Sequence, residues 1–169
     1  DGSRRFAERV VMHLEVPYTD EERQAHQALQ EYSELRLKHA ISDGERMAAE
    51  FVLKLLKKRL FSSPAAFGVT LEKHITTVGG KKATSKVSRD IDNFSDDYAD
   101  DDEYETETGE VISAVSQTLS PISSDEKALL RQLSEYAAKA SLRPDCKAKT
   151  LIDWLRKTLC PGGTWNRER

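Results

Sequence analysis

The sequence has few residues that could cross-link the chain or place it in a membrane. It contains two cysteines, two tryptophans and five prolines in 169 residues, and no long apolar run. A membrane-spanning helix needs about 20 consecutive apolar residues, so we expect neither a membrane span nor a membrane partner. The sequence also has no large excess of positive or negative charge. The 26 Lys and Arg against 29 Asp and Glu give a net charge of −3, which by itself indicates neither nucleic acid nor a membrane surface.

The two cysteines are not expected to form a disulfide. Cys146 and Cys160 stand at the two ends of a segment with helical periodicity. A helix would hold them about 20 Å apart at roughly 1.5 Å per residue, which is beyond the reach of a disulfide. Unpaired thiols fit a reducing compartment, so we expect a cytoplasmic protein. The chain has no initiator methionine and no signal peptide, so we expect it to be cut from something longer, or processed.

Motifs that carry catalysis or bind metals are also lacking. Residues 79–82, Gly-Gly-Lys-Lys, do not fit the phosphate-loop pattern G-x-x-x-x-G-K-[ST], and residues 90–95 lack the third ligand and the glycine of a calcium loop. Four scattered histidines show no metal-ligand spacing: His13, His26, His39 and His74. We therefore predict no catalytic residue, no metal site and no cofactor in this chain.

What the sequence does contain is helical periodicity. Ser63 and Pro64 fit the N-cap and N1 positions of one helix, and Leu151 to Leu159 carries the apolar stripe of the last one. Three S/T-x-x-E capping boxes open the others: Thr19 with Glu22, Ser42 with Glu45, and Ser123 with Glu126. Before them, Val10 to Val16 alternates like a short strand that Pro17 ends. We predict an all-α fold, a bundle of about five helices with one short N-terminal strand.

The segment from Gly79 to Glu110 differs in composition. Eleven of the 21 residues from Asp90 to Glu110 are Asp or Glu, and the few apolar residues show no sustained period. Such a composition buries too little apolar surface to offset the entropy of ordering the chain. We predict a disordered acidic insertion over residues 79–110.

The candidate site is a basic cluster at the end of the second predicted helix, made of Lys54, Lys57, Lys58 and Arg59. Lys54 and Lys58 share a face at i, i+4, and Lys57 lies one turn from Lys54. Two interpretations stay open. The cations bind nucleic-acid phosphates, or they are a solvated helix end that complements the helix dipole, which is the commoner reason for basic helix ends.

Three stretches, in this order around the acidic gap, resemble a known family. They are VPYTDEERQAHQALQEY (16–32), KKRLFSSPAAFGVTLEKHI (57–75) and RPDCKAKTLIDWLRKTLCPGGTWNRER (143–169). Together they are similar to the region between the two motor lobes of bacterial Swi/Snf-type helicases of superfamily 2, which are DNA-dependent ATPases that translocate on duplex DNA. The resemblance implies five parts: the end of the first lobe (1–18), a helical bridge (19–78), the flexible acidic insertion (79–110), a helical return (111–142) and the start of the second lobe (143–169).

The resemblance also implies what this chain does and does not do. The phosphate loop, the Asp-Glu box and the arginine finger of the family have no counterpart here, so ATP and magnesium would belong to the parent enzyme. The expected partners are the parent's own motor lobes and duplex DNA, with self-association through the unpaired strand. The alternative is a helical protein-interaction module whose acidic arm binds a basic partner or mimics DNA.

Overall fold

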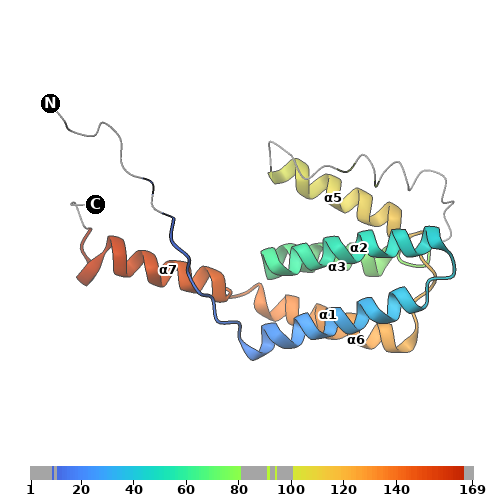
Figure 1. Cartoon of the computed structure of the whole chain (residues 1–169), viewed down its shortest axis with the longest axis horizontal. Coiled ribbons are helices and arrows are strands. Elements are labelled where there is room, and N and C mark those ends of the chain that lie inside the picture. Colours follow the sequence, from blue (N-terminus) through green and yellow to red (C-terminus); the bar gives the residue numbers. More distant parts are fainter. Residues whose placement is uncertain (1–8, 10, 81–90, 92–93, 95–100, 166–169) are drawn as a thin grey trace. The chain divides into compact units, whose positions relative to one another are not determined.

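The computed structural model in Figure 1 describes residues 9, 11–80, 91, 94 and 101–165. The regular structure in these residues is entirely helical, which confirms the predicted all-α class. The elements are α1 (Asp20–Lys38), α2 (Asp43–Ser62), α3 (Pro64–Thr77), α5 (Asp101–Ser116), α6 (Ser124–Ala140), α7 (Cys146–Leu159) and the short 3-10 helix η1 (Pro161–Gly163). Thr19–Asp145 form one compact unit, and the described residues on either side of it form a second.

The unit Thr19–Asp145 is a closed ring of four helices with a fifth laid against it. Helices α1, α2, α3 and α6 contact one another in that order, and α6 returns to α1. Helix α5 packs on α2 and α3, so that these two form the middle layer between α5 and the α1–α6 pair (Figure 1). The side chains of Leu56, Phe67 and Leu133 are completely buried between the helices. This core accounts for the ring, because each helix turns its apolar stripe inward.

The helices begin where the caps predict. Reciprocal capping boxes start α1 at Thr19 and α6 at Ser123, and the Ser63 hydroxyl caps α3 with Pro64 in its first turn. The cap of α2 is different. The Ser42 hydroxyl accepts from the Glu45 amide at 3.2 Å, but the Glu45 carboxylate accepts from the Ser120 amide at 2.6 Å. Glu45 thereby ties the start of α2 to the loop before α6.

The predicted N-terminal strand is not supported. Residues 11–16 have no strand structure, and Val10 lies outside the described residues. Val11 and Met12 are exposed, at 70% and 58%. An alternating pattern makes a strand only where a neighbouring strand supplies hydrogen-bond partners, and the described residues supply none. Self-association through a strand edge stays a prediction that the described residues do not test.

The predicted acidic insertion is wrong over residues 101–110, which belong to α5. The buried face of this helix continues on both sides of Glu110, the predicted end of the insertion. Thr108, Ile112 and Val115 follow at i, i+4 and i+7, and all three are buried. Residues 81–90, 92–93 and 95–100 of the predicted insertion lie outside the described residues.

The start of α1 and the end of α6 lie next to each other. The guanidinium of Arg143, three residues after α6, pairs with the carboxylate of Glu21 in the first turn of α1. The chain therefore enters and leaves the five-helix unit at one place. Beyond it, α7 keeps three apolar side chains at least one-third exposed: Leu151, Ile152 and Leu155. None of the helices in the described residues has the length and apolar content needed to cross a membrane.

Candidate functional site

The structure divides the basic cluster between two sides of α2. Lys54 and Lys57 are exposed and line a groove between α1 and α2. Lys58 and Arg59 instead meet α5, where the Lys58 ammonium lies 5.4 Å and the Arg59 guanidinium 4.7 Å from the centre of the Tyr104 ring. The four residues are neighbours in sequence, but the 100° turn per residue of a helix sends them in different directions.

Arg59 lies inside the unit. Its side chain is 6% exposed and pairs with the carboxylate of Glu105 in α5. Among the described residues, Nε and Nη2 have no hydrogen-bond partner. A guanidinium in this position is covered by α5 and does not reach a phosphate in solvent. Among the four predicted site residues, Lys54 and Lys57 are therefore the two that face solvent with no carboxylate partner among the described residues.

This division predicts different costs for two neighbouring substitutions. Arg59→Ala removes the partner of Glu105 and the contact with Tyr104, so we expect the free energy of unfolding to fall by about 1–3 kcal/mol. Lys57→Ala removes an exposed side chain, and we expect a change within about 0.5 kcal/mol. Urea unfolding of both variants measures the difference. Equal effects of the two substitutions would contradict the buried position of Arg59.

The groove between α1 and α2 has an apolar floor and a cationic rim. Its volume is about 500 Å³, and its floor includes Leu29 and Leu53, both more than 90% buried. The His26 and Phe61 rings, with centroids 4.4 Å apart, close one end. Lys54 and Lys57 stand along the α2 side. The groove can hold a ligand that combines apolar groups with negative charge.

A second feature, a polar network, lies in the core of the same unit. Both ring nitrogens of His74 have hydroxyl partners: Nε2 lies 2.5 Å from the Tyr32 hydroxyl and Nδ1 2.7 Å from the Ser116 hydroxyl. Beside them, Arg36 Nε lies 3.2 Å from the Glu126 carboxylate, and Arg36 Nη1 donates to the Ser120 carbonyl at 2.9 Å. These contacts join α1, α3, α5 and α6.

Burial sets the ionisation of this network. It lowers the pKa of His74 from 6.5 to about 4, and the nearby Arg36 charge adds to the effect, so the imidazole is neutral at pH 7. Burial also raises the pKa of the Tyr32 phenol well above its usual range. Burial opposes ionisation of Glu126, but hydrogen bonds from Ser123 and the charge of Arg36 outweigh it and lower the pKa of that carboxyl. The network thus holds one buried ion pair and neutral partners.

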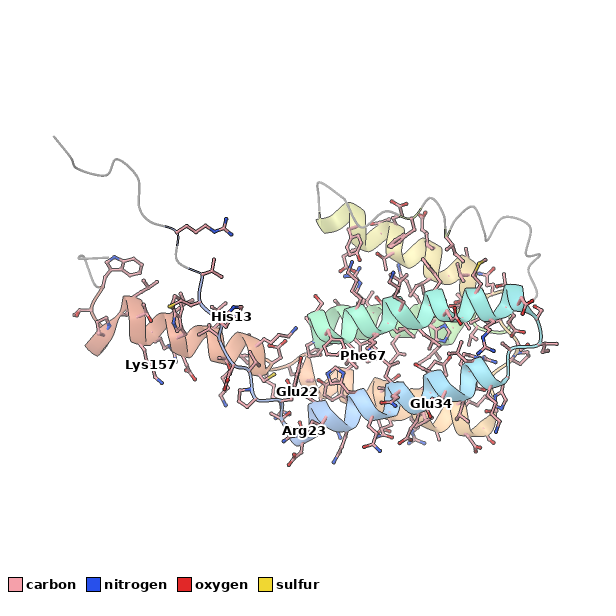
Figure 2. All side chains as sticks on the ribbon, viewed as in Figure 1. His13, Glu22, Arg23, Glu34, Phe67 and Lys157 are labelled. Atoms are coloured by element: carbon pink, nitrogen blue, oxygen red, sulfur yellow. The ribbon has the colours of Figure 1, made fainter. Side chains whose placement is uncertain are left out.

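The burial of the network indicates a structural role. A histidine beside a serine is the arrangement of a base and a nucleophile, but His74 and Ser116 are both 0% exposed, so a substrate does not reach them. Figure 2 shows the side chains on the ribbon, with Phe67 among those that fill the space between the helices of the bundle. In the described residues no group of three His, Cys, Asp or Glu is placed to hold a metal ion.

Sequence reasoning missed the network and the groove. One signal was available for the network: Arg36 and His74 stand in the apolar register of their helices, one turn after Tyr32 and Leu71. No comparable sequence pattern predicts the groove, because its two walls come from different helices. Comparison with family models, with curated proteins and with solved structures finds no match to this chain.

Proposed function

We propose that this chain is a non-catalytic helical module between the two motor lobes of a Swi/Snf-type, DNA-dependent ATPase, where it couples the lobes and contacts the DNA backbone. The observation that carries the proposal is the pairing of Glu21 with Arg143 at the entry and exit of the five-helix unit. A domain whose two ends meet can stand between two segments of another domain without separating them. In this proposal the flanking residues, which form a unit of their own, would be those segments.

The interior of the five-helix unit suits a coupling role. A connector transmits force only if its helices hold one arrangement. The buried ion pair of Arg36 with Glu126, and the bond from the Ser120 amide to Glu45, join elements that are far apart in sequence. Buried polar contacts between distant segments favour one packing of the helices. The tight joint at Ser63 and Pro64 adds to this, since a single residue separates α2 from α3.

Contact with the DNA backbone would use Lys54 and Lys57. We expect this chain to bind a duplex of about 20 base pairs weakly, with an affinity that falls steeply as salt rises. Each lost phosphate contact lowers the slope of log K against log salt by about 1. Lys54→Ala/Lys57→Ala should therefore reduce the slope by about 2 and weaken binding to all sequences alike. Fluorescence anisotropy at several salt concentrations measures it.

A matched control is available on α6. Lys127 and Lys139 are exposed there, so Lys127→Ala/Lys139→Ala changes the net charge by the same amount away from the groove. If both double variants lower the slope equally, the effect is one of net charge. If neither changes it, Lys54 and Lys57 belong to a solvated helix end and the DNA contact is wrong.

The second candidate function is a helical protein-interaction module, and the groove between α1 and α2 favours it. In the described part of the acidic segment, Glu105 is already paired with Arg59 and does not offer a free carboxylate to a basic partner. A groove with an apolar floor and a charged rim is a common way for one protein to hold a segment of another. The role between motor lobes is compatible with this second function, since the entry and exit of the unit and the groove involve different residues. Contact with DNA and binding in the groove both use Lys54 and Lys57, so these two would compete.

A further inference from the structure

We infer that the groove between α1 and α2 binds an acidic amphipathic helix of a partner protein. The inference rests on the second proposed function, the interaction module, and names its partner class. It does not depend on the role between motor lobes.

The groove has the length and the direction of a helix. Its α1 wall runs from His26 to Leu37 and its α2 wall from Glu50 to Phe61. Each wall spans eleven residue steps, or about 16 Å at 1.5 Å per residue, which corresponds to three helical turns. The lining residues of each wall recur at three- and four-residue spacing, so they form one continuous face. A third helix laid along two others meets them in this way.

The charges of the groove select an acidic partner. Lys54 and Lys57 stand exposed on the rim, one turn apart. The one carboxylate among the lining residues is Glu50, and the guanidinium of Arg46 lies 3.5 Å from it. The α1 wall contributes neutral polar groups, among them Gln30 and Ser33. The rim therefore carries net positive charge above an apolar floor, and a helix with leucines on one side and glutamates beside them is its complement.

The opposite side of α2 already holds a helix of this kind. Helix α5 is rich in Asp and Glu, and it packs on α2 and α3 through buried Ile112 and Val115. Its Glu105 pairs with Arg59, and its Tyr104 lies under the Lys58 and Arg59 cations. Helix α2 thus binds an acidic helix of its own chain through cations on one side, and on its other side it carries two further cations, Lys54 and Lys57, beside the groove.

Duplex DNA fits the groove less well. Protein–DNA interfaces are more polar and much more positively charged than protein–protein interfaces. The phosphate backbone has no apolar group to cover the side chain of Phe61, which is 40% exposed at the end of the groove. Two lysines above an apolar floor match carboxylates on an apolar helix better than a row of phosphates.

The test uses two designed peptides of about 15 residues, with leucine at i, i+3, i+4 and i+7 and either glutamate or lysine beside them. The whole chain is titrated with each, and binding is followed by peptide fluorescence and by amide shifts in the chain. We expect the glutamate peptide to bind and to shift amides of α1 and α2, while the lysine peptide does not bind. Lys54→Glu/Lys57→Glu should weaken the binding of the glutamate peptide by about tenfold or more.

The matched control is Lys127→Glu/Lys139→Glu, which makes the same charge change on exposed residues of α6 and should leave binding within about twofold, since rim charges act locally. Phe61→Ala, which shortens an exposed side chain at the end of the groove, should weaken binding without unfolding the chain. Equal loss in both charge variants, or unchanged binding in Lys54→Glu/Lys57→Glu and Phe61→Ala, overturns the assignment to the groove.

The remaining outcomes separate this inference from the function on which it rests. Binding of the lysine peptide alone keeps the interaction module and overturns the acidic partner. No binding of either peptide overturns both. Binding of duplex DNA that is lost in Lys54→Glu/Lys57→Glu, without peptide binding, assigns the two lysines to DNA and overturns the inference.

Discussion

Replacing Arg36 by methionine is expected to lower the free energy of unfolding by about 3–5 kcal/mol, because it leaves the Glu126 carboxylate buried without its cation. The side chains of Arg36 and Glu126 are 2% and 0% exposed, so water cannot take the place of the guanidinium. The substitution also removes the donor to the Ser120 carbonyl. Domains of this size are stable by about 5–15 kcal/mol, so the variant loses a large share of its stability. Urea unfolding measures the loss.

Two further variants show whether the ion pair is the cause. Arg36→Met/Glu126→Gln removes both charges and keeps an acceptor for the Ser123 amide, so we expect it to be more stable than Arg36→Met alone. Arg131→Met breaks an exposed ion pair on α6, where Arg131 Nε lies 3.0 Å from Glu135, and should change stability by less than about 1 kcal/mol. If Arg36→Met costs no more than Arg131→Met, the buried pair does not stabilise this unit.

Acid should destabilise the five-helix unit through His74. The pKa of its imidazole is about 4 in the folded protein against 6.5 for the free group, because burial disfavours the charged form. Above pH 6.5 the ring is neutral in both states. Between pH 6.5 and 4 the unfolded chain binds a proton that the folded chain does not, so stability falls as the pH falls. The loss totals about 3 kcal/mol and ends below pH 4, where both states are protonated.

Unfolding free energies at pH 7 and at about pH 4.5 test this shift. His74→Gln removes the titration and keeps a polar side chain beside Tyr32 and Ser116, so its stability should depend less on pH in this range. The pKa values of Glu45 and Glu126 are lowered in the folded protein, so protonating these carboxylates destabilises the fold as the pH falls further. This loss occurs in both the wild type and His74→Gln. His13→Gln changes an exposed histidine outside the unit and serves as the control. A wild-type profile that matches His74→Gln would contradict a depressed pKa.

The predictions that succeeded depend on residues close together in the chain. The caps at Thr19, Ser63 and Ser123 involve partners three residues away, so the sequence contains the whole interaction. The failed predictions depend on distant partners. The strand predicted at Val10–Val16 would need a second strand beside it. Helix α5 packs on α2 and α3, and its acidic composition does not reveal these contacts.

The candidate site shows the same limit. The basic cluster was visible as four neighbouring residues, but its division between a groove and a buried ion pair depends on where α1 and α5 pack. The polar network joins residues that are 42 and 84 positions apart, Tyr32 with His74 and Arg36 with Ser120. Helical spacing identifies the face on which each of these residues lies, and the partner on the facing helix requires the fold.

The nucleotide sequence on both sides of the coding region for residues 1–169 tests the proposed role between motor lobes most directly. The account predicts one open reading frame with a phosphate loop, G-x-x-x-x-G-K-[ST], and an Asp-Glu box upstream, and an arginine-finger motif of a second motor lobe downstream. A reading frame that ends close to these residues, or that continues without those motifs, would contradict the role between motor lobes.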